Sequence, residues 1–306
     1  PEARKHILEA LEKTKALVHK DPITHVVNVH ERCGTAIEYI ATKQWFIKYL
    51  DKKKLLAKAG DALVWYPEHM KNRYDNWIKG LQWDWCISRQ RHFGIPIPVW
   101  YCNKCQGVLL PEEKDLPIDP LEDKPSKPCG CGSKEFTPEK DVLDTWATSS
   151  LTPQIAALLV PEKYNEIYPM DFRQNSHDII TFWLFNTVVK SQLHHCTNPW
   201  DDVMITGWVL DSHGKKMSKS KGNVVDPREV WTKYSVDALR FTAAGTKLGS
   251  DYPFQEKDLL TGQKTITKLW NAAKFCFTHL EGYSLKKPQT LEAFDQWVLI
   301  KLQKLI

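Results

Sequence analysis

Four lysines gather within seven residues of one glycine-punctuated stretch, GWVLDSHGKKMSKSKGNVVD at 207–226; they are Lys215, Lys216, Lys219 and Lys221. Residues 207–210 predict a strand, residues 211–214 a turn that ends on glycine, and Gly222 followed by Asn223 a second break before a helix. We call residues 211–223 the lysine loop. Positioned ammonium groups suit a polyphosphate, because they stabilise a transferring phosphoryl group without covalent chemistry. By composition alone, a solvated basic surface loop is the more common explanation of such a run.

Four of the eight cysteines form two close pairs, Cys102 with Cys105 and Cys129 with Cys131. The first pair has the two-residue spacing of a zinc knuckle, and the second, with one glycine between its members, can converge on the same tetrahedral ion. The segment between the pairs is rich in Pro, Asp, Glu and Lys, so we expect a structural zinc ion to order it. Free thiols on an unfolded insertion remain the alternative. The isolated cysteines are expected to be small buried hydrophobes: Cys33, Cys86, Cys196 and Cys276.

The elements around the lysine loop alternate as in a doubly wound parallel α/β sheet. Residues 141–160 predict a strand-to-helix corner with Pro153 just inside the helix. Residues 171–195 predict a short polar strand and then a helix that is apolar on nearly every face and therefore central. A strand, the lysine loop and a helix over 227–244 follow, which places the ligand end at the carboxyl ends of these strands. Arg89, Gln90 and Arg91 are expected on a turn, either in salt bridges or in contact with substrate.

The string Lys216-Met217-Ser218-Lys219-Ser220 is identical to the signature of class I aminoacyl-tRNA synthetases, and nearly the whole chain resembles that family. The resemblance implies a loop that closes over ATP and its Mg²⁺, with Lys216 and Lys219 catalytic. Lys219 is expected to stabilise the pentavalent phosphate as the aminoacyl-adenylate forms and pyrophosphate leaves. The implied ATP contacts are Asp178, at the ribose, Met217, Ser218, Lys219 and Ser220. One departure is Ser176, which stands where the family usually has glycine and puts close approach to the nucleotide in doubt.

Two tryptophan-containing stretches narrow the resemblance to the valine-specific branch in its archaeal-type version: DTWATSS at 144–150 and HDIITFW at 177–183. That likeness implies that Trp146, Ile179 and Trp183 wall a pocket for a branched four-carbon amino acid. Ile179 and Trp183 are four residues apart, which places both on one helix face. The implied activity is the activation of valine with ATP and its transfer to tRNA(Val). An isoleucine-specific synthetase and a non-catalytic zinc- and RNA-binding module are the alternatives.

The same resemblance implies that the chain is a fragment. No His-x-Gly-His stretch, the family's partner signature for the ATP phosphates, occurs in the 306 residues, so we expect half of an active site that is inactive alone. The implied segments are a remnant of an editing domain (1–22), a return ribbon with a catalytic-domain segment (23–100), a zinc-binding insertion (101–140), the second half of a Rossmann-like catalytic domain (141–250) and the start of a helical anticodon-binding domain (251–306).

Composition sets few further limits. A formal charge of +5 and a pI near 8.7 permit a tRNA partner without requiring one. No apolar run approaches the roughly 20 residues that cross a bilayer, and no leader sequence is recognisable. We therefore expect a cytoplasmic protein without a membrane partner, monomeric in its full-length form.

Overall fold

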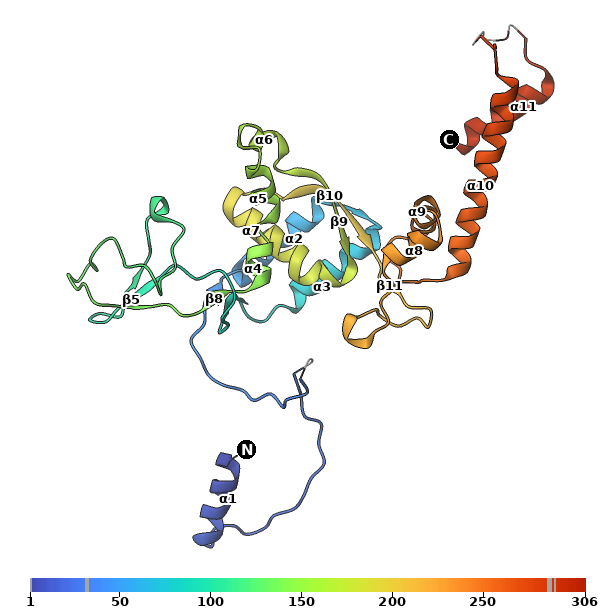
Figure 1. Ribbon diagram of the computed structural model, residues 1–306. Coiled ribbons are helices and arrows are strands. Elements are labelled where there is room, and N and C mark those ends of the chain that lie inside the picture. The colour runs from blue at the N-terminus through green and yellow to red at the C-terminus, as the bar shows by residue number, and fades with distance from the viewer. Residues whose placement is uncertain (1, 31–32, 285–287, 289) are drawn as a thin grey trace. The chain divides into compact units, whose positions relative to one another are not determined.

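The computed structural model describes residues 2–30, 33–284, 288 and 290–306 (Figure 1). The chain divides into two compact units, 1–44 and 45–306. The first holds helix α1 (Glu2–Lys13) and an ion pair of 2.8 Å between Arg4 and Glu38. The return ribbon expected at the start of residues 23–100 is less regular than predicted. Among the described residues, only the bridge between Val29 and Ala36 and strand β1 (Phe46–Ile47) pair as strands there.

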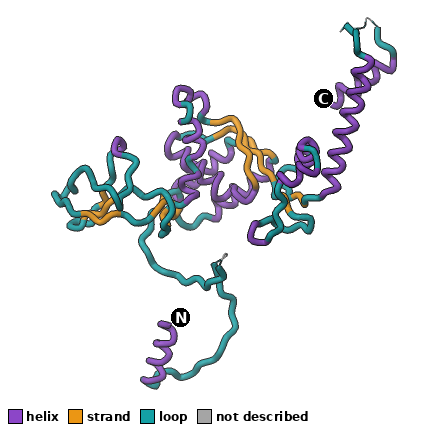
Figure 2. The backbone as a smooth tube through the Cα atoms, in the orientation of Figure 1, coloured by secondary structure: helices purple, strands orange, loops and turns teal. Residues whose placement is uncertain are grey.

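A three-stranded parallel sheet forms the centre of the second unit (Figure 2). Its order is β2 (Val64–Tyr66), β10 (Trp200–Thr206) and β9 (Met170–Ser176), so that β10 is paired on both sides. The side chains of Trp200, Val203 and Ile205 are completely buried. In the described part of the chain, no strand pairs with the outer edge of β9. The parallel α/β fold predicted from the sequence is confirmed.

Helix α7 (Phe185–His195) lies in the core, as its apolar faces predicted. It packs with α2 (Lys53–Asp61) and α3 (Lys71–Gly80), each preceded by one 3₁₀ turn, at 50–52 and 68–70. The fully buried ring of Phe185 meets Tyr74 with ring centroids 5.7 Å apart. Burial of such a side chain contributes about 1.5–3 kcal/mol to the stability of the fold. This buried cluster therefore stabilises the helices that pack beside the parallel sheet.

The helix predicted to follow β9 is not one regular α-helix. A 3₁₀ turn at His177–Ile179 is followed by a π-helical turn at Ile180–Leu184, and only then does α7 begin. The wider π turn lets Ile180, Trp183 and Leu184 all enter the core. Such turns are frequent at functional sites.

The corner at 141–160 has the predicted elements in an unpredicted pairing. Strand β8 (Val142–Leu143), α4 (Thr145–Ser149) and α5 (Thr152–Leu158) follow one another, and Pro153 lies in the first turn of α5. However, β8 pairs antiparallel with β4 (Ser88–Arg89), so this corner is not part of the parallel sheet. Arg89 lies in that strand and not on a turn. A second antiparallel pair joins β1 to β3 (Trp85–Cys86), and α6 (Tyr164–Ile167) precedes β9.

The cysteine-containing insertion has its own antiparallel sheet. Its order is β6 (Val108–Leu109), β5 (Trp100–Cys102) and β7 (Phe136–Pro138). Asn103 N–H donates to Glu135 O at 3.0 Å and extends the contact between the two arms of the insertion. The sheet therefore brings the two cysteine pairs to one end.

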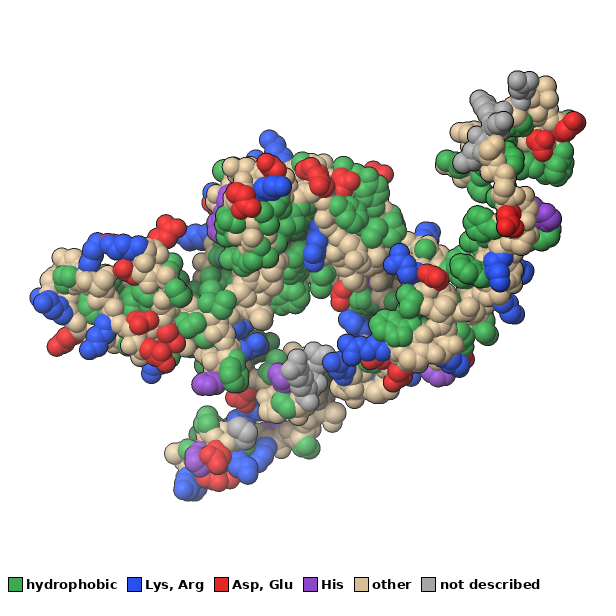
Figure 3. All heavy atoms as spheres, turned by 45° about the horizontal axis from the view of Figure 1, so that its top comes forward, with side chains coloured by type: hydrophobic (Ala, Val, Ile, Leu, Met, Phe, Trp, Pro, Cys, Tyr) green, Lys and Arg blue, Asp and Glu red, His purple; other side chains and the backbone are tan. Residues whose placement is uncertain are grey.

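Beyond the parallel sheet, β11 (Val209–Leu210) pairs in parallel with β12 (Tyr252–Pro253). The single helix expected at 227–244 is two helices, α8 (Pro227–Lys233) and α9 (Val236–Ala244), because Ser235 caps the second through Ala238 N–H. Helices α10 (Glu256–His279) and α11 (Ala293–Leu305) follow and expose apolar side chains (Figure 3). Trp270 and Phe294 are 67% and 70% exposed. Among the described residues, no helix combines the length and apolarity needed to cross a bilayer.

Candidate active site and metal centre

The neck of the lysine loop is organised by Asp211, which is buried. One carboxylate oxygen accepts the backbone N–H groups of His213 at 2.9 Å and Lys215 at 2.8 Å, and the other accepts the Asn223 amide at 2.8 Å. The Asn223 amide and the Lys215 N–H hold the pKa of Asp211 below its usual range. Gly214 and Gly222 have φ of +75° and +66°, so the two predicted chain breaks are real turns. The loop is thus held in shape by its own side chains.

Lys216, the first lysine of the signature, points toward the end of β9. Its ammonium lies 3.6 Å from the centroid of the Trp208 ring and 3.4 Å from Asp178 Oδ2. Burial raises the pKa of Asp178, but the nearby Trp208 indole, Ser176 hydroxyl and Lys216 ammonium outweigh burial and hold that pKa below its usual range. Two residues 38 positions apart, expected from the sequence to serve one nucleotide, are therefore neighbours.

The rest of the signature lies in a short 3₁₀ turn, Lys219–Lys221, and the residues before it. The hydroxyls of Ser218 and Ser220 are 2.8 Å apart, and Met217 Sδ accepts the Val225 N–H at 3.5 Å. In the part of the chain that the structure describes, the Lys219 ammonium has no hydrogen bond or ion pair. Lys219 is therefore available to an anion.

Several buried polar atoms beside this loop have no hydrogen-bond partner among the described residues. They are both amide atoms of Asn175 and His177 Nδ1, whereas the Ser176 hydroxyl and the Trp208 indole act on the Asp178 carboxylate. Buried polar groups are nearly always paired, so such a cluster points to a ligand or segment that satisfies it. The sequence pointed to Ser176 but not to Asn175 or His177, although the polar run QNSH at the carboxyl end of a predicted strand was a signal for them.

The three residues expected in the amino-acid pocket have different surroundings. Trp146 is 37% exposed and stacks on Phe182, with centroids 6.0 Å apart. Trp183 is buried, stacks on Trp200 at 5.5 Å and carries the Arg173 guanidinium 4.4 Å from its ring centroid. Ile179 packs on the same core as Trp183 but ends the 3₁₀ turn, so the two are not on one face of a regular α-helix as their spacing predicted.

Arg89 and Gln90 both make contacts within the protein. Arg89 Nη2 lies 3.3 Å from Asp144 Oδ2, and Gln90 donates to Asp141 Oδ2 at 2.6 Å. Asp144 is 5% exposed and directly precedes α4, which carries Trp146. Arg91 is exposed.

The four clustered cysteines converge. Their sulfur atoms all lie within 4.8 Å of one another, with Cys102 Sγ 3.6 Å from Cys131 Sγ and Cys105 Sγ 3.5 Å from Cys129 Sγ. Four thiolates about 2.3 Å from one zinc ion would be separated by nearly these distances, so the donor set and spacing fit zinc. Backbone N–H groups of Cys105 and Lys104 lower the pKa of Cys102 to about 6. The isolated cysteines differ from expectation: Cys33, Cys196 and Cys276 are exposed, and Cys86 is half-buried.

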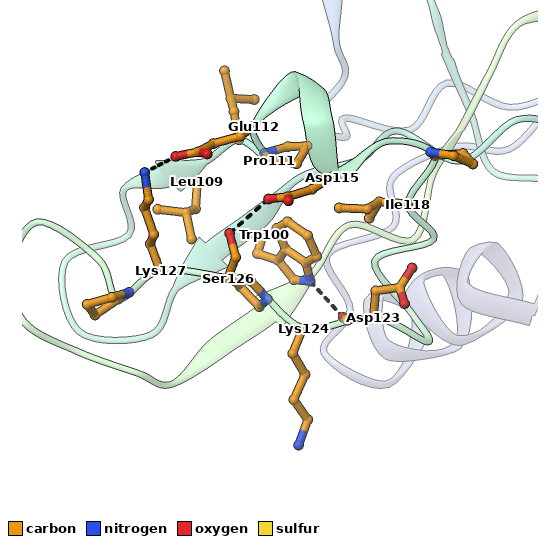
Figure 4. Close-up of a pocket in the computed structure, with 14 residues that line it drawn as sticks. Trp100, Leu109, Pro111, Glu112, Asp115, Ile118, Asp123, Lys124, Ser126 and Lys127 are labelled. Atoms are coloured by element: carbon orange, nitrogen blue, oxygen red, sulfur yellow. Dashed lines mark hydrogen bonds and ion pairs between the residues drawn. The ribbon is translucent and has the colours of Figure 1, made fainter.

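The insertion also has an apolar anchor that the sequence analysis did not foresee. Trp100 is 2% exposed, and its indole N–H points to Pro120 O at 3.2 Å and Asp123 O at 3.3 Å. A cavity of about 320 Å³ borders this ring, and its lining includes a hydrogen bond of 3.0 Å between Ser126 and Asp115 and an ion pair between Lys127 and Glu112 (Figure 4). The polar segment is therefore not ordered by the cysteines alone.

The chain is similar to a known family of proteins. The family described as "tRNA synthetases class I (I, L, M and V)" matches residues 8–255. A valine–tRNA ligase of Thermoplasma volcanium is 46% identical over 100% of this chain and 39% of its own length, and one of Picrophilus torridus is 45% identical over 99% of this chain and 39% of its own. The chain thus spans about two fifths of the length of these relatives.

A solved structure shares the fold. Mycobacterium tuberculosis methionyl-tRNA synthetase in complex with methionyl-adenylate matches with a TM-score of 0.64 and 18% identity, covering 91% of this chain and 50% of that one. The family match over residues 8–255 includes both the lysine loop and the three strands of the parallel sheet. The chain belongs to the class I tRNA synthetases of the I, L, M and V group.

Proposed function

We propose that this chain forms the second half of the catalytic domain of a valine–tRNA ligase. Such an enzyme joins valine to ATP, releasing pyrophosphate and forming valyl-adenylate, and then transfers valine to tRNA(Val). The observation that carries the proposal is the placement of signature residue Lys216 beside Asp178 at the carboxyl ends of β9 and β10. The likeness to valine–tRNA ligases along the whole chain supports the choice of valine.

Within this proposal, Asp178 receives the hydroxyls of the ATP ribose, and Met217, Ser218 and Ser220 line the nucleotide. Because Lys216 holds Asp178 at 3.4 Å, ribose binding exchanges that contact and releases the ammonium toward the phosphates. Lys216 and Lys219 then place two positive charges where negative charge develops as pyrophosphate leaves. Mg²⁺ bound to ATP would supply further charge on the phosphate oxygens.

Trp146, Ile179 and Trp183 are proposed to bound the valine side chain, with the two indoles as rigid walls. Cys102, Cys105, Cys129 and Cys131 are proposed to hold a structural Zn²⁺ whose role is to fix the two arms of the insertion. The five segments inferred from the sequence remain our proposed domain limits. A cytoplasmic, monomeric enzyme remains our expectation.

The test is valine-dependent ATP–pyrophosphate exchange after the chain is combined with a segment that carries the His-x-Gly-His signature. Lys219→Ala is expected to lower kcat roughly 100- to 1000-fold and to leave KM for ATP nearly unchanged, because the contact acts on the transition state. Lys215→Ala is the matched control, since only the backbone of Lys215 is bonded in the loop neck. Equal, small effects of both substitutions would reject the catalytic loop and favour an RNA-binding module.

A further inference from the structure

The segment that leads into α10 lies directly on the strand that leads into the lysine loop. Gly249 N–H donates to Ile205 O at 2.8 Å, Tyr252 N–H to Trp208 O at 2.8 Å and Phe254 N–H to Leu210 O at 2.9 Å. A Cβ on Gly207 would lie 2.0 Å from Ser250 O, so the two backbones touch at a place that only glycine fits. Residues 249–254 and 205–210 therefore have a fixed register.

The side chain of Asp251, in the same segment, also contacts this strand and the end of β9, through one carboxylate oxygen. Its Oδ1 accepts the Trp208 backbone N–H at 2.8 Å and lies 2.7 Å from His177 Nε2. Because a carboxylate only accepts, this ring nitrogen carries the proton. The His177 side chain is 8% exposed, and its ring centroid lies 4.8 Å from that of the Trp208 indole, with the two planes tilted by 45°. The bonds from Trp208 N–H and His177 hold the pKa of Asp251 below its usual range.

His177 and Trp208, the two residues that Asp251 contacts, are neighbours of the residues proposed to bind the nucleotide. His177 directly precedes Asp178, and Trp208 carries the Lys216 ammonium on its ring. A shift of either would move Asp178 relative to Lys216. Misplacement of reacting groups by about 1 Å can cost roughly 100-fold in rate.

We propose that Asp251 is a positioning residue for the nucleotide site, which sets the spacing between Asp178 and the lysine loop by holding the His177 ring and the Trp208 backbone on one oxygen. The inference rests on the function proposed above. Asp251 precedes β12 and α10. A movement of these elements would therefore shift His177 and Trp208 through the Asp251 carboxylate.

Three variants separate positioning from general stability. Asp251→Ala removes the shared acceptor, whereas Asp251→Asn keeps an oxygen that can accept both N–H groups. Glu256→Ala is the matched control: it removes a carboxylate of the same segment that contacts Lys233 and Tyr234 and touches neither His177 nor Trp208.

In ATP–pyrophosphate exchange by the reconstituted catalytic domain, Asp251→Ala is expected to lower kcat roughly 10- to 100-fold with KM for valine unchanged. Asp251→Asn and Glu256→Ala are expected to stay within about threefold of the parent, because both keep the shared acceptor. Parent-like kinetics for Asp251→Ala, or equal losses in Asp251→Ala and Glu256→Ala that follow a lowered melting temperature, would overturn the proposal.

A second measurement does not depend on the proposed function. Trypsin cleavage of the 306-residue chain at the loop lysines is expected to speed up in Asp251→Ala and not in Asp251→Asn or Glu256→Ala, because the strand that leads into the loop loses its side-chain contact at Trp208. If the parent shows no valine-dependent exchange, the proposed function fails while this readout still decides the role of Asp251. Unchanged cleavage in Asp251→Ala would refute the positioning role.

Discussion

The Asn223 side-chain amide donates to Asp211 Oδ2 at 2.8 Å, across the neck of the lysine loop. The same asparagine donates to Lys216 O at 3.2 Å and accepts the Ser218 N–H at 2.9 Å. One side chain thus satisfies three polar groups of a segment with little apolar content. The lysine loop is therefore built on a hydrogen-bonded base and not on a packed core.

Asn223→Ala should raise the pKa of Asp211 toward its ordinary value, because the amide of Asn223 is the largest cause of the lowered pKa. A carboxyl group with a lowered pKa stabilises the folded form above its ordinary pKa, and that contribution is lost as pH falls through the lower, folded value. The loop of the variant should accordingly open at higher pH than that of the parent.

Carboxyl-carbon NMR titration of Asp211 and amide exchange of Lys215 would measure both effects. Asn165→Ala, on an exposed position of α6, is the control. An unchanged Asp211 titration in Asn223→Ala would show that the amide does not sustain the neck.

Zinc removal should loosen the insertion only in part. We expect about one zinc per chain by elemental analysis, and its loss in Cys105→Ser, because three thiolates close a tetrahedral site poorly. The control is Cys276→Ser, an exposed cysteine of α10. Proteolysis of the metal-free protein should begin near the cysteine pairs before it reaches residues 110–128, which Trp100 anchors. A zinc-free parent with a protease-resistant insertion would rule the metal out.

Arg89→Ala should destabilise the fold by about 3–5 kcal/mol, because it leaves the carboxylate of Asp144, 5% exposed, without its cation. Arg91→Ala, two residues away and exposed, should change stability little. Urea unfolding of the two variants measures the difference. Comparable midpoints for both would mean that the Arg89 pair adds nothing to the fold.

Local signals in the sequence predicted the strand-loop-helix order around the lysine loop. Apolar residues on every face placed α7 in the core, and glycine and asparagine marked both turns of the lysine loop. The signature and the Asp178 stretch were each recognisable by residue type. That both serve one ligand end was expected because the carboxyl ends of successive parallel strands meet there, but the direct contact of Lys216 with Asp178 was not predicted.

Contacts between residues far apart in the chain could not be predicted, because the spacing of residues along the sequence carries no information about them. Asp251 and His177 are 74 positions apart, and nothing in either neighbourhood specifies a shared hydrogen bond. The pairing of β8 with β4 depends on two-residue strands, which have no measurable periodicity. The π turn before α7 likewise changes which face Ile179 presents, and an i to i+4 count assumes a regular helix.

The burial and ring contacts of Trp146 and Trp183 decide which of the two tryptophans can be used to test amino-acid selectivity. Trp183 stacks on Trp200 and is buried, so Trp183→Ala should cost about 3–5 kcal/mol of stability and confuse any kinetic result. Trp146 is 37% exposed and rests on Phe182 alone among its ring contacts in the described chain, so its removal should leave the fold intact.

If Trp146 is a wall of the valine pocket, Trp146→Ala should admit the extra methylene of isoleucine. The ratio of isoleucine to valine activation, measured as kcat/KM in ATP–pyrophosphate exchange, should rise about 10- to 200-fold, the range that one methylene commands in an apolar pocket. Phe182→Leu is the control, because it keeps an apolar support under Trp146 and should change the ratio far less. A ratio that stays at the parent value in Trp146→Ala would remove Trp146 from the pocket and leave Ile179 and Trp183 as the proposed walls in this chain.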